Sequence, residues 1–365
     1  MIKSKSLEGA LVQYIRNIHR VMLAVLICTS LHARAFKSDL IDSYFADYNH
    51  PDRPGASVLV MKQGKILYER GYGSRELVYY EPVNERTNFR LASVSKQFTA
   101  TAILLLVQRG QLSLDTFLVS VFPDFPSYGS KITVGHLLNH TSGLTDYEDL
   151  IPSIQVKQLT DQDVLNLLKK QNGLYFSPGS QYRYSNGGYV LLGLIVESLS
   201  GQNFAEFLEE NIFRPLQMNH SVMYDGPSTE IENRAYGHSL LGNGFKQTDQ
   251  NITSATRGDG GIYSSAHDWV RWETAISENL ILSQKYQEMV FTPGKLNNGT
   301  LIDYGFGWML NRFQGLVHQY HTGSTIGFRT SVERFPDKEL VVLVLVNRAN
   351  ALPWVTARNI AEQLF

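Results

Sequence analysis

Residues 340–346 read LVVLVLV, seven apolar residues in succession with no alternation of polar and apolar positions. Such a run, rich in β-branched valine, is typical of a strand that is covered on both faces of its sheet. FRTSVERF and the turn PDKE come directly before it, and a helix is predicted from about Pro353 to Leu364. The far end of the chain therefore predicts a strand hairpin inside a layered fold.

A second hairpin is predicted near the beginning of the chain. The segment SVLVMKQGKILYERGYG, residues 57–73, reads as two strands around a Gln63-Gly64 turn, and SDLIDSYFADY before it predicts a short helix. We expect the two hairpins to join in one sheet that is assembled from both chain ends.

The middle of the chain has a helical pattern. DQDVLNLLKKQNG, GYVLLGLIVESLSG and NFAEFLEENIFRP carry apolar residues at spacings of three and four, and Gly173, Gly201 and Pro215 are the predicted stops. Residues 225–261, rich in Gly, Asn, Ser and Thr, are expected to be irregular, either disordered or the wall of a binding site.

Residues 1–35 differ from the rest of the chain. Lys3, Lys5, Arg16 and Arg20 precede the apolar run VMLAVLICTSL, and ARA ends at Ala35. This order is typical of a secretory signal peptide, so we expect cleavage and a periplasmic or secreted bacterial protein without a stable membrane span. The run is short for a membrane helix. An uncleaved N-terminal anchor is the alternative, because the region before the apolar run is long.

Composition and charge narrow the classes of partner. The full chain is 43% hydrophobic and 18% charged, an ordinary globular composition. Cleavage after Ala35 would leave 28 basic and 33 acidic residues, and this negative balance argues against a nucleic-acid partner. It would also remove Cys28, the one cysteine, which excludes disulfides, thiolate catalysis and cysteine-bound zinc.

The segment LASVSKQFTATAILLLVQRG, residues 91–110, predicts an amphipathic helix that begins near Ser93 and ends at Gly110. Lys96 then lies one turn from Ser93, and its amine can reach the serine hydroxyl. A serine becomes a nucleophile only when a base accepts its proton. Lysine has an ordinary pKa of about 10.4, so Lys96 would need a pKa lower by about 2–3 units, through burial, nearby cations and the helix dipole. A solvated first-turn lysine is the alternative.

Two further motifs accompany this Ser-x-x-Lys pair. SPGSQYRYSNGGYVLLG contains YSN at residues 184–186, and YHTGSTIGFR contains HTGS at residues 321–324. In order and spacing, the three elements resemble the signatures of the penicillin-recognising serine hydrolases. The likeness is to the class C β-lactamase branch, which also holds D,D-peptidases, D-aminopeptidases and esterases, and it extends over nearly all of residues 40–350.

The resemblance implies an α/β fold (of the α+β type) like that of β-lactamases and D,D-peptidases. Helices would flank an antiparallel sheet built from both chain ends, and an all-helical lobe would be inserted between them. We expect one serine hydrolase domain over residues 36–365, with an α/β lobe from about 36–90 and 255–365 and a helical lobe from about 91–254.

The resemblance also implies roles for the motif residues. Ser93 would be the nucleophile and Lys96 its proton partner, with Tyr184 as a second acid or base and His321 in the third catalytic element. The backbone N–H groups of Ser93 and Ser324 would form the oxyanion hole. Whether Lys96 or Tyr184 is the acylation base stays open.

Four other positions would bind substrate. Asn186 would bind the amide or ester side chain of the substrate, and Gly323 would let the substrate approach closely. Thr322 would contribute to the same strand, and Tyr147 would line the cleft wall.

Two departures from the lactamase pattern bear on the substrate. Lactamases usually have Lys-Thr-Gly at the third motif, where His321 stands here, and above pH 7 a neutral imidazole attracts a carboxylate less than lysine does. In the carboxypeptidase branch an arginine follows a Tyr-Gly-x-Gly stretch, but YGFGWML has Met309 at that place, with Arg312 and Arg329 as nearby substitutes. Less charged esters and peptides are therefore expected before β-lactams.

Other catalytic arrangements are less well supported. His136 and His140 stand four apart, as two metal ligands on one helical face do. Without a third ligand we expect packing and capping roles for them, and no metal or organic cofactor. The sequence has no G-x-S-x-G, so an α/β-hydrolase nucleophile elbow is not indicated.

The sequence thus predicts an exported serine hydrolase that performs acyl transfer on D-amino-acid peptides, small esters and, weakly, β-lactams. Two alternatives stay open: a class C-like β-lactamase, and a catalytically silent penicillin- or peptidoglycan-binding module. The expected partner is a small-molecule or peptide substrate, and we expect a monomer.

Overall fold

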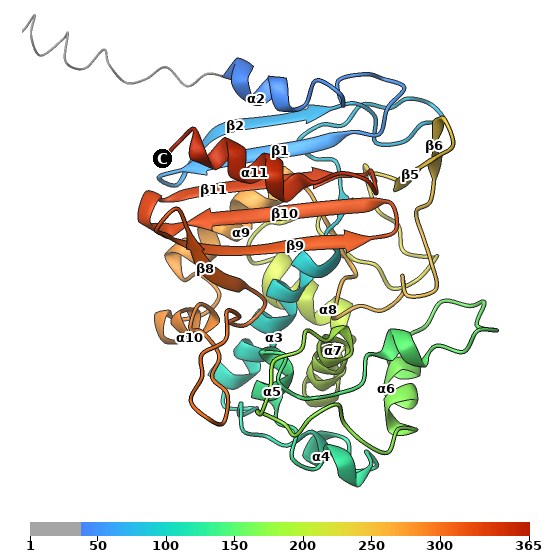
Figure 1. The fold of residues 1–365 in the computed structure, drawn as a ribbon, viewed down its shortest axis with the longest axis vertical. Coiled ribbons are helices and arrows are strands. Elements are labelled where there is room, and N and C mark those ends of the chain that lie inside the picture. Colours follow the sequence, from blue (N-terminus) through green and yellow to red (C-terminus); the bar gives the residue numbers. More distant parts are fainter. Residues whose placement is uncertain (1–37) are drawn as a thin grey trace, which may run out of the picture. The chain divides into compact units, whose positions relative to one another are not determined.

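The computed structural model describes residues 38–365 (Figure 1). The predicted signal peptide, residues 1–35, lies outside the described residues. Helix α2, Ser38–Tyr44, occupies the place where the sequence predicts a short helix. Among the described residues, no helix has both the length and the apolar character that crossing a membrane requires.

A six-stranded antiparallel sheet runs through the compact unit that begins at Tyr44. Its strand order is β2-β1-β11-β10-β9-β8 (Figure 1). β1 pairs with β11 along its whole length, from Ala56 opposite Val346 to Lys62 opposite Leu340. The prediction that both chain ends build one sheet is confirmed. The strands are β1 Ala56–Lys62, β2 Lys65–Tyr72, β8 Met309–Phe313, β9 Leu316–Thr325, β10 Phe328–Phe335 and β11 Leu340–Val346.

Local sequence explains the turn between β1 and β2. Gln63 and Gly64 both have a positive φ, 53° and 69°. A two-residue turn with this geometry matches the right-handed twist of the strands that it joins. The predicted hairpin around these two residues is therefore confirmed.

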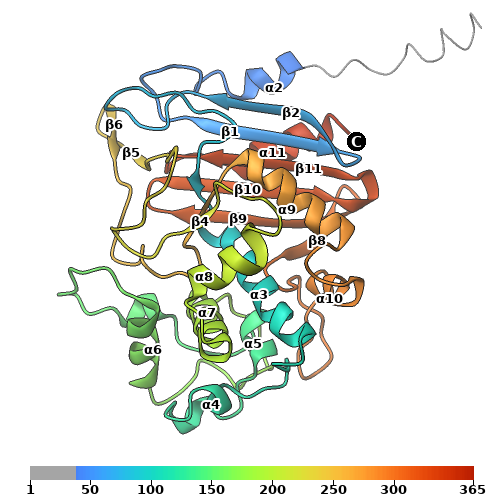
Figure 2. The same ribbon diagram turned by 180° about the vertical axis from the view of Figure 1, so that it is seen from behind.

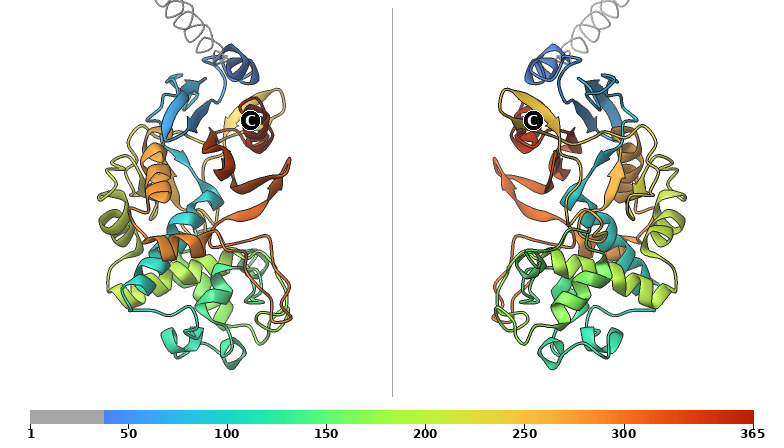
Figure 3. Two further views of the ribbon diagram at one scale, coloured as in Figure 1. Left: turned by 90° about the vertical axis from the view of Figure 1, so that its left-hand side faces the viewer. Right: turned by 90° about the vertical axis from the view of Figure 1, so that its right-hand side faces the viewer.

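Both faces of β11 are covered, as its sequence predicts. All seven residues of the strand are buried. Helix α11, Pro353–Glu362, packs on β10 and β11, and helix α9, Ala266–Glu278, contacts β1 from the opposite face (Figures 1 and 2). Figure 3 shows the strands edge-on between these two helices.

Most of the remaining helices lie beneath the sheet in the view of Figure 1. The three helices predicted in the middle of the chain are confirmed, and α7 ends at Gly201, which has the left-handed φ of 71° typical of a C-terminal glycine. The helices are α3 Lys96–Gln108, α4 Leu118–Val121, α5 Val134–Leu138, α6 Asp161–Lys169, α7 Asn186–Ser200, α8 Phe204–Leu208 and α10 Gln284–Val290. Short helical turns are η1 Ala92–Ser95, η2 Ser127–Gly129, η3 Tyr147–Leu150, η4 Glu209–Phe213 and η5 Pro336–Lys338.

Helix α3 differs from the amphipathic helix that its sequence predicts. Every residue from Lys96 to Leu106 is buried, including the polar side chains of its first two turns. A helix that is enclosed on all sides packs against several elements at once, and α3 contacts α7, α8 and α10. The prediction of one solvent-facing side was wrong because other elements pack around the whole of α3, where its first turns carry the small residues Thr99, Ala100, Thr101 and Ala102.

Residues 225–261 are not wholly irregular, and that expectation was wrong for their central part. β5 and β6 form a hairpin there, and Gly242 in its turn has a φ of 63°. The Gly-Asn-Gly sequence of this turn is the signal that points to a hairpin. The remaining short strands are β3 Phe89–Arg90, β4 Val222–Met223, β5 His238–Leu241, β6 Gly244–Gln247 and β7 Ile262–Ser264, of which β3, β7 and β4 form a second sheet.

Candidate active site

Ser93 lies in η1, the single helical turn directly before α3, and is partly exposed. Ala92 before it has a φ of 50°, in the left-handed region that costs energy for a residue with a side chain. Neighbouring elements hold this conformation, because Leu91 N–H donates to Ile262 O at 2.8 Å and Thr330 Oγ1 donates to Leu91 O at 2.8 Å. The serine is thus fixed where both sheets meet the helix.

Lys96 is wholly buried one turn further on. Its Nζ donates to Ser93 Oγ at 3.3 Å, to Asn186 Oδ1 at 2.8 Å and to Asp259 O at 2.7 Å. Burial lowers the pKa of Lys96 to about 8, although the negative charges of Asp259 and Glu148 act in the opposite direction. The amine is therefore positioned to take a proton from Ser93, and it loses its own proton far more easily than a solvated lysine.

Tyr184 stands next to this pair, with its ring centre 5.0 Å from Lys96 Nζ. Burial raises the pKa of its phenol, while the nearby Ser93 side chain acts in the opposite direction. No hydrogen bond of good geometry reaches the buried hydroxyl from the residues that the structure describes. Tyr184 is thus a neutral phenol with an unused polar atom beside the serine.

His321 lies on β9 and is also buried. Its Nδ1 is 2.8 Å from Thr322 O, and because a carbonyl only accepts, the proton of the neutral ring is on Nδ1. Its Nε2 then accepts from the Tyr304 hydroxyl at 3.2 Å. Burial and the charge of Lys96 lower the pKa of His321 to about 3, so the imidazole is uncharged in the working pH range.

The outer half of β9 has a free edge. β8 pairs with β9 only as far as Tyr320, whereas β10 pairs with β9 as far as Thr325. Thr325 and Phe328 close the two-residue turn, and hydrogen-bonded and non-hydrogen-bonded pairs alternate from there. The N–H of Ser324, opposite Arg329, therefore points away from β10 toward the free edge, as an oxyanion-hole donor must.

Packing explains why position 323 is a glycine, a reason that the sequence did not indicate. A Cβ at this position would come within 2.1 Å of Thr330 Oγ1 and 2.2 Å of Leu91 O. The missing side chain thus lets β9 pack against η1, while close approach of the substrate at Gly323 stays a prediction. Thr322, next to it, is partly exposed, and its carbonyl holds the ring of His321.

Both polar atoms of the Asn186 side-chain amide form hydrogen bonds. Its Oδ1 accepts from Lys96, and its Nδ2 donates to Glu148 Oε1 at 2.7 Å. The exposed Glu148 carboxylate, the amide, the buried amine and the Ser93 hydroxyl thus form a continuous chain of hydrogen bonds.

Tyr147 does not line an open cleft, and that expectation was wrong. Only 1% of its surface is exposed, and its hydroxyl donates to Asp259 Oδ2 at 3.3 Å. Its ring packs under the start of α7, where a Cβ on Gly187 would lie 3.6 Å from it. Tyr147 therefore supports the site from below.

Sequence reasoning assigned no role to Glu148, Asp259 or Tyr304, and for His140 it expected only packing or capping. His140 lies in the HLLNHTSGL stretch, Glu148 lies shortly after it, and Asp259 lies in GDGGIYSSAHDWVRW. Both segments resemble stretches that flank the cleft in the penicillin-recognising serine hydrolases. Those stretches were the available signal. Tyr304 is the tyrosine of the Tyr-Gly-x-Gly stretch in YGFGWML, and its contacts with His321, His140 and Tyr184 connect it with the site.

The two histidines that were considered as metal ligands have other partners. His136 Nδ1 accepts from Thr133 N–H at 3.1 Å in a capping box at the start of α5, as expected. His140 Nδ1 accepts from Ser185 N–H at 3.1 Å. In the part of the chain that the structure describes, no group of three or more His, Cys, Asp or Glu side chains is placed to hold a metal ion.

Of the two arginines considered as substitutes for the residue at Met309, one lies next to the outer half of β9. Arg329 is opposite Ser324 on β10, and its Nη1 donates to Thr325 O and Phe328 O at 2.7 Å. Arg312 on β8 is exposed and bonds to its own turn.

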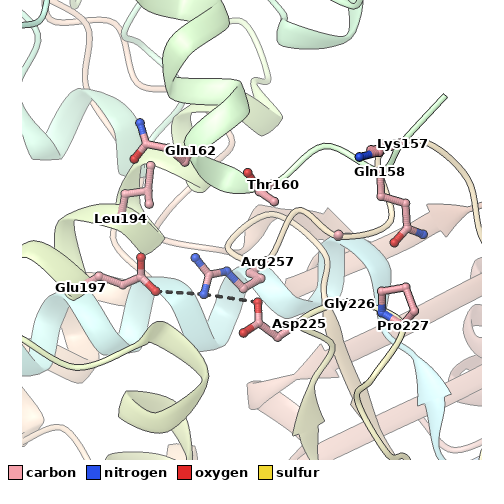
Figure 4. A pocket seen from close by; sticks show the side chains of 11 residues that line it. Lys157, Gln158, Thr160, Gln162, Leu194, Glu197, Asp225, Gly226, Pro227 and Arg257 are labelled. Carbon is pink, nitrogen blue, oxygen red and sulfur yellow. Dashed lines mark ion pairs between the residues drawn. The ribbon is translucent and has the colours of Figure 1, made fainter. Parts of the chain in front are cut away.

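A separate pocket of about 560 Å³ is lined by residues of α6, α7 and the loops beside them (Figure 4). Arg257 is its charged centre and pairs with Glu197 at 2.9 Å, with Asp225 at 3.5 Å and with the buried Asp161 at 2.8 Å. These three carboxylates offset the positive charge of the Arg257 guanidinium. The pocket therefore has an ion-pair network but no nucleophile beside a base.

Comparison with known proteins agrees with this arrangement. A family model described as Beta-lactamase matches residues 41–365. A penicillin-binding protein of Bacillus subtilis (strain 168) is 35% identical over 309 residues, which cover 80% of this chain and 68% of the relative. The D-aminopeptidase of Gluconobacter oxydans (strain 621H) is 28% identical over 322 residues, which cover 85% of this chain and 59% of the relative. The chain thus spans about three fifths to two thirds of these curated relatives.

Solved structures share the fold. A D-amino acid amidase from Ochrobactrum anthropi SV3, in complex with D-phenylalanine, has a TM-score of 0.75 at 25% identity, covering 89% of this chain and 98% of its own. An octameric penicillin-binding protein homologue from Pyrococcus abyssi has a TM-score of 0.78 at 27% identity, covering 90% and 77%. The predicted mixed α/β architecture is therefore confirmed.

Proposed function

Since this chain belongs to the beta-lactamase family of serine hydrolases, we propose that it cleaves an amide or ester bond through an acyl-enzyme formed on Ser93. One observation carries the proposal: a fully buried Lys96 amine, 3.3 Å from the Ser93 hydroxyl, whose pKa burial lowers to about 8. Burial of a lysine without a task for its amine is costly and rare. Because burial lowers the pKa of the amine, a larger fraction of it is neutral near the working pH and can accept a proton.

In the proposed acylation, the Ser93 hydroxyl oxygen attacks the carbonyl carbon of the substrate and its proton passes to the neutral amine of Lys96. The backbone N–H groups of Ser93 and Ser324 donate to the oxygen that becomes negative. The tetrahedral intermediate then collapses, and the bond to the leaving amine or alcohol breaks. The leaving group takes the proton that Lys96 accepted from Ser93, either directly or through Tyr184, whose phenol Lys96 then reprotonates. Water repeats the sequence to release the acid and restore Ser93.

The charges around the site bear on the class of substrate. His321 is uncharged, and Glu148 places an exposed carboxylate one hydrogen bond from Asn186. Such surroundings favour an acyl group that is neutral or carries an ammonium. We propose D-amino-acid amides, D-amino-acid peptides with a free amine, and small esters as substrates, in keeping with the names of the D-aminopeptidase and D-amino acid amidase relatives.

A side-by-side rate comparison tests this class. Purified protein is assayed with D-phenylalanine amide, L-phenylalanine amide, p-nitrophenyl butyrate, nitrocefin and a D-Ala-D-Ala peptide, with Ser93→Ala as the blank. The expected order is the D-amide or the ester first and nitrocefin last. Faster turnover of nitrocefin than of every amide and ester would make the class C-like β-lactamase the better assignment.

Arg329 supports one second candidate, a hydrolase of substrates that end in a carboxylate. Arg329 is opposite Ser324 in the register of β9 and β10, and its guanidinium donates to Thr325 O and Phe328 O beside Ser324. We propose that this cation binds an anionic group of the substrate near the oxyanion hole. If Arg329→Gln lowers kcat/KM for the D-Ala-D-Ala peptide about 10-fold or more but not for p-nitrophenyl butyrate, the carboxylate is bound there.

The silent binding module makes a different prediction from either enzyme. A fluorophosphonate probe reacts covalently with an activated serine, so we expect label on the wild type and none on Ser93→Ala. Absence of label on both proteins would leave the binding module as the remaining proposal.

We further propose that the mature protein is exported and monomeric, with the helical lobe of residues 91–254 inserted into the α/β lobe. The octameric homologue shows that this fold also occurs in larger assemblies. Light scattering of the purified protein decides between these states, and N-terminal sequencing of the secreted protein tests cleavage after Ala35.

A further inference from the structure

His140 follows α5 and is enclosed next to the site. Only 1% of it is exposed, and its φ of 59° places it in the left-handed region. Non-glycine residues adopt this conformation at a cost, so the surrounding contacts must hold it there. The proposed mechanism gives His140 no proton to carry.

Two hydrogen bonds from His140 hold the residues on either side of Tyr184. Its backbone oxygen accepts from Arg183 N–H at 2.9 Å, and its ring Nδ1 accepts from Ser185 N–H at 3.1 Å. The backbone of Tyr184 therefore cannot shift along the chain direction without breaking one of them.

The imidazole also holds the Tyr184 side chain. The two ring centres are 4.2 Å apart with an angle of 35° between the planes. Tyr304, which donates to His321, meets the imidazole edge-on at 4.5 Å and 63°. The His140 ring thus contacts both the phenol beside Ser93 and the tyrosine that orients His321.

The His140 ring is neutral, with its proton on Nε2, so its hydrogen bond to the Ser185 N–H does not change with pH. Its Nδ1 accepts a backbone N–H, so the proton of the neutral ring is on Nε2, which has no hydrogen-bond acceptor among the described residues. Burial and the charge of Lys96 lower the pKa of His140 well below the ordinary value, so the ring stays neutral.

We propose that His140 is the positioning residue for Tyr184, and that it sets the distance from the phenol to Ser93 and Lys96. The inference rests on the proposed acyl transfer. It assigns the histidine of HLLNH a role in the rate of the reaction and not in substrate binding or metal binding.

Two substitutions distinguish the contribution of the His140 ring from that of its Nδ1 hydrogen-bond acceptor. His140→Phe keeps a stacked ring but leaves the Ser185 N–H without its acceptor. His140→Asn keeps an acceptor near the Nδ1 position and tolerates a positive φ, but removes the ring. We expect His140→Phe to lower kcat for p-nitrophenyl butyrate about 10-fold or more with KM within about twofold, and His140→Asn to recover part of that loss.

A double-mutant cycle with Tyr184→Phe tests whether His140 acts through the phenol. Once the hydroxyl is absent, its placement has no consequence, so His140→Phe should lower kcat no further in the Tyr184→Phe background. His238→Phe is the matched control, because His238 is another histidine with 1% exposure and lies on β5 outside the site. It should leave kcat within about twofold of wild type.

Additive losses in the cycle, or a His140→Phe protein with wild-type kcat, would overturn the inference. If His140→Phe does not fold, the cycle is run with His140→Asn. Fluorophosphonate labelling of the wild type distinguishes the two proposals: no Ser93-dependent label refutes the proposed acyl transfer, whereas labelled wild type with an additive cycle refutes only the role of His140.

Discussion

At Lys96, burial and the charges of nearby carboxylates act on the pKa in opposite directions. Removal from water lowers the pKa from 10.5 to about 8, while the nearby charges of Asp259 and Glu148 raise it. A shift of this size corresponds to about 3 kcal/mol of difference between the two protonation states. An amine with a pKa close to the working pH can both accept and return a proton, as a two-step acyl transfer requires.

The pH dependence of acylation follows from this pKa. Because the neutral amine is the base, the rate of Ser93 labelling by a fluorophosphonate should rise with pH and level off above about pH 8. Lys96→Met, which has no amine, should be labelled at least about 100-fold more slowly, and its labelling rate should show no such rise with pH. A wild-type rate that is constant between about pH 6 and pH 10 would contradict Lys96 as the base.

The same group makes stability depend on pH. In the unfolded chain Lys96 has its ordinary pKa of 10.5, and in the folded chain about 8, so between these values the unfolded state binds more protons. The free energy of unfolding therefore rises with pH across this window. Relative to Lys96→Met, the wild type should gain up to about 3 kcal/mol between pH 7 and pH 10, as measured by urea unfolding. Parallel pH dependence of the two proteins would refute this account.

His321 offers a test of charge at the third motif. His321→Lys introduces a cation where the wild type has a neutral imidazole, so above pH 7 the ratio of kcat/KM for nitrocefin to that for p-nitrophenyl butyrate should rise about 10-fold, or about 1.4 kcal/mol. His321→Gln, which stays neutral, is the control. An unchanged ratio in His321→Lys would mean that the side chain does not act on the substrate through its charge.

Between elements, the contact of β9 with η1 determines how the two proposed oxyanion-hole donors are spaced. Gly323 makes this contact possible, because Leu91 O and Thr330 Oγ1 occupy the place of its Cβ. Leu91 and Ser93 belong to the same short segment, while Ser324 follows Gly323 on the strand. The two backbone N–H groups therefore move relative to each other if the strand moves.

Gly323→Ala should separate β9 from η1. We expect a loss in kcat of about 100-fold or more, since removal of one oxyanion donor costs about 2.7–4 kcal/mol in the transition state. Gly244→Ala is the matched control, because a Cβ on Gly244 meets no atom within 4 Å. Kinetics with p-nitrophenyl butyrate provide the measurement, and equal activity of the two variants would refute the role of the contact.

For the whole molecule, the pairing of β1 with β11 and the enclosure of α3 connect all parts of the unit from Tyr44 to Phe365. β9 and β10 contact η1, and α3 contacts α7 and α8. A lobe of residues 91–254 would therefore share its central helix and its active site with the sheet. The division into two lobes stays a prediction.

We expect this unit to unfold in a single transition. Circular dichroism and the loss of fluorophosphonate labelling should give the same urea midpoint, and hydrogen exchange should be slowest in α3, β1 and β11, which are the most enclosed elements. Two separate midpoints would show that the helical segment unfolds independently of the sheet.

Sequence patterns alone were sufficient for β1, β2, β10 and β11 of the sheet and for the spacing of the motif residues. An unbroken apolar strand, two hairpins with turn residues at the right places, and helices at three- and four-residue spacing each depend on a few neighbouring residues, so local physics is enough to predict them. The proximity of Ser93 and Lys96 is of this kind too, because one helical turn separates them. Their roles in catalysis stay predictions.

The surroundings of the Lys96 amine, and the side chains that reach the site, depend on contacts between distant parts of the chain. Two of the three hydrogen-bond partners of Lys96 are 90 and 163 residues away along the chain, and no local pattern encodes such contacts. For the same reason the sequence misjudged the solvent-facing side of α3 and the exposure of Tyr147, and it did not indicate the packing of Gly323 against Leu91. Burial is a property of the whole fold, since it depends on which distant segments pack together, and here burial gives Lys96 its lowered pKa.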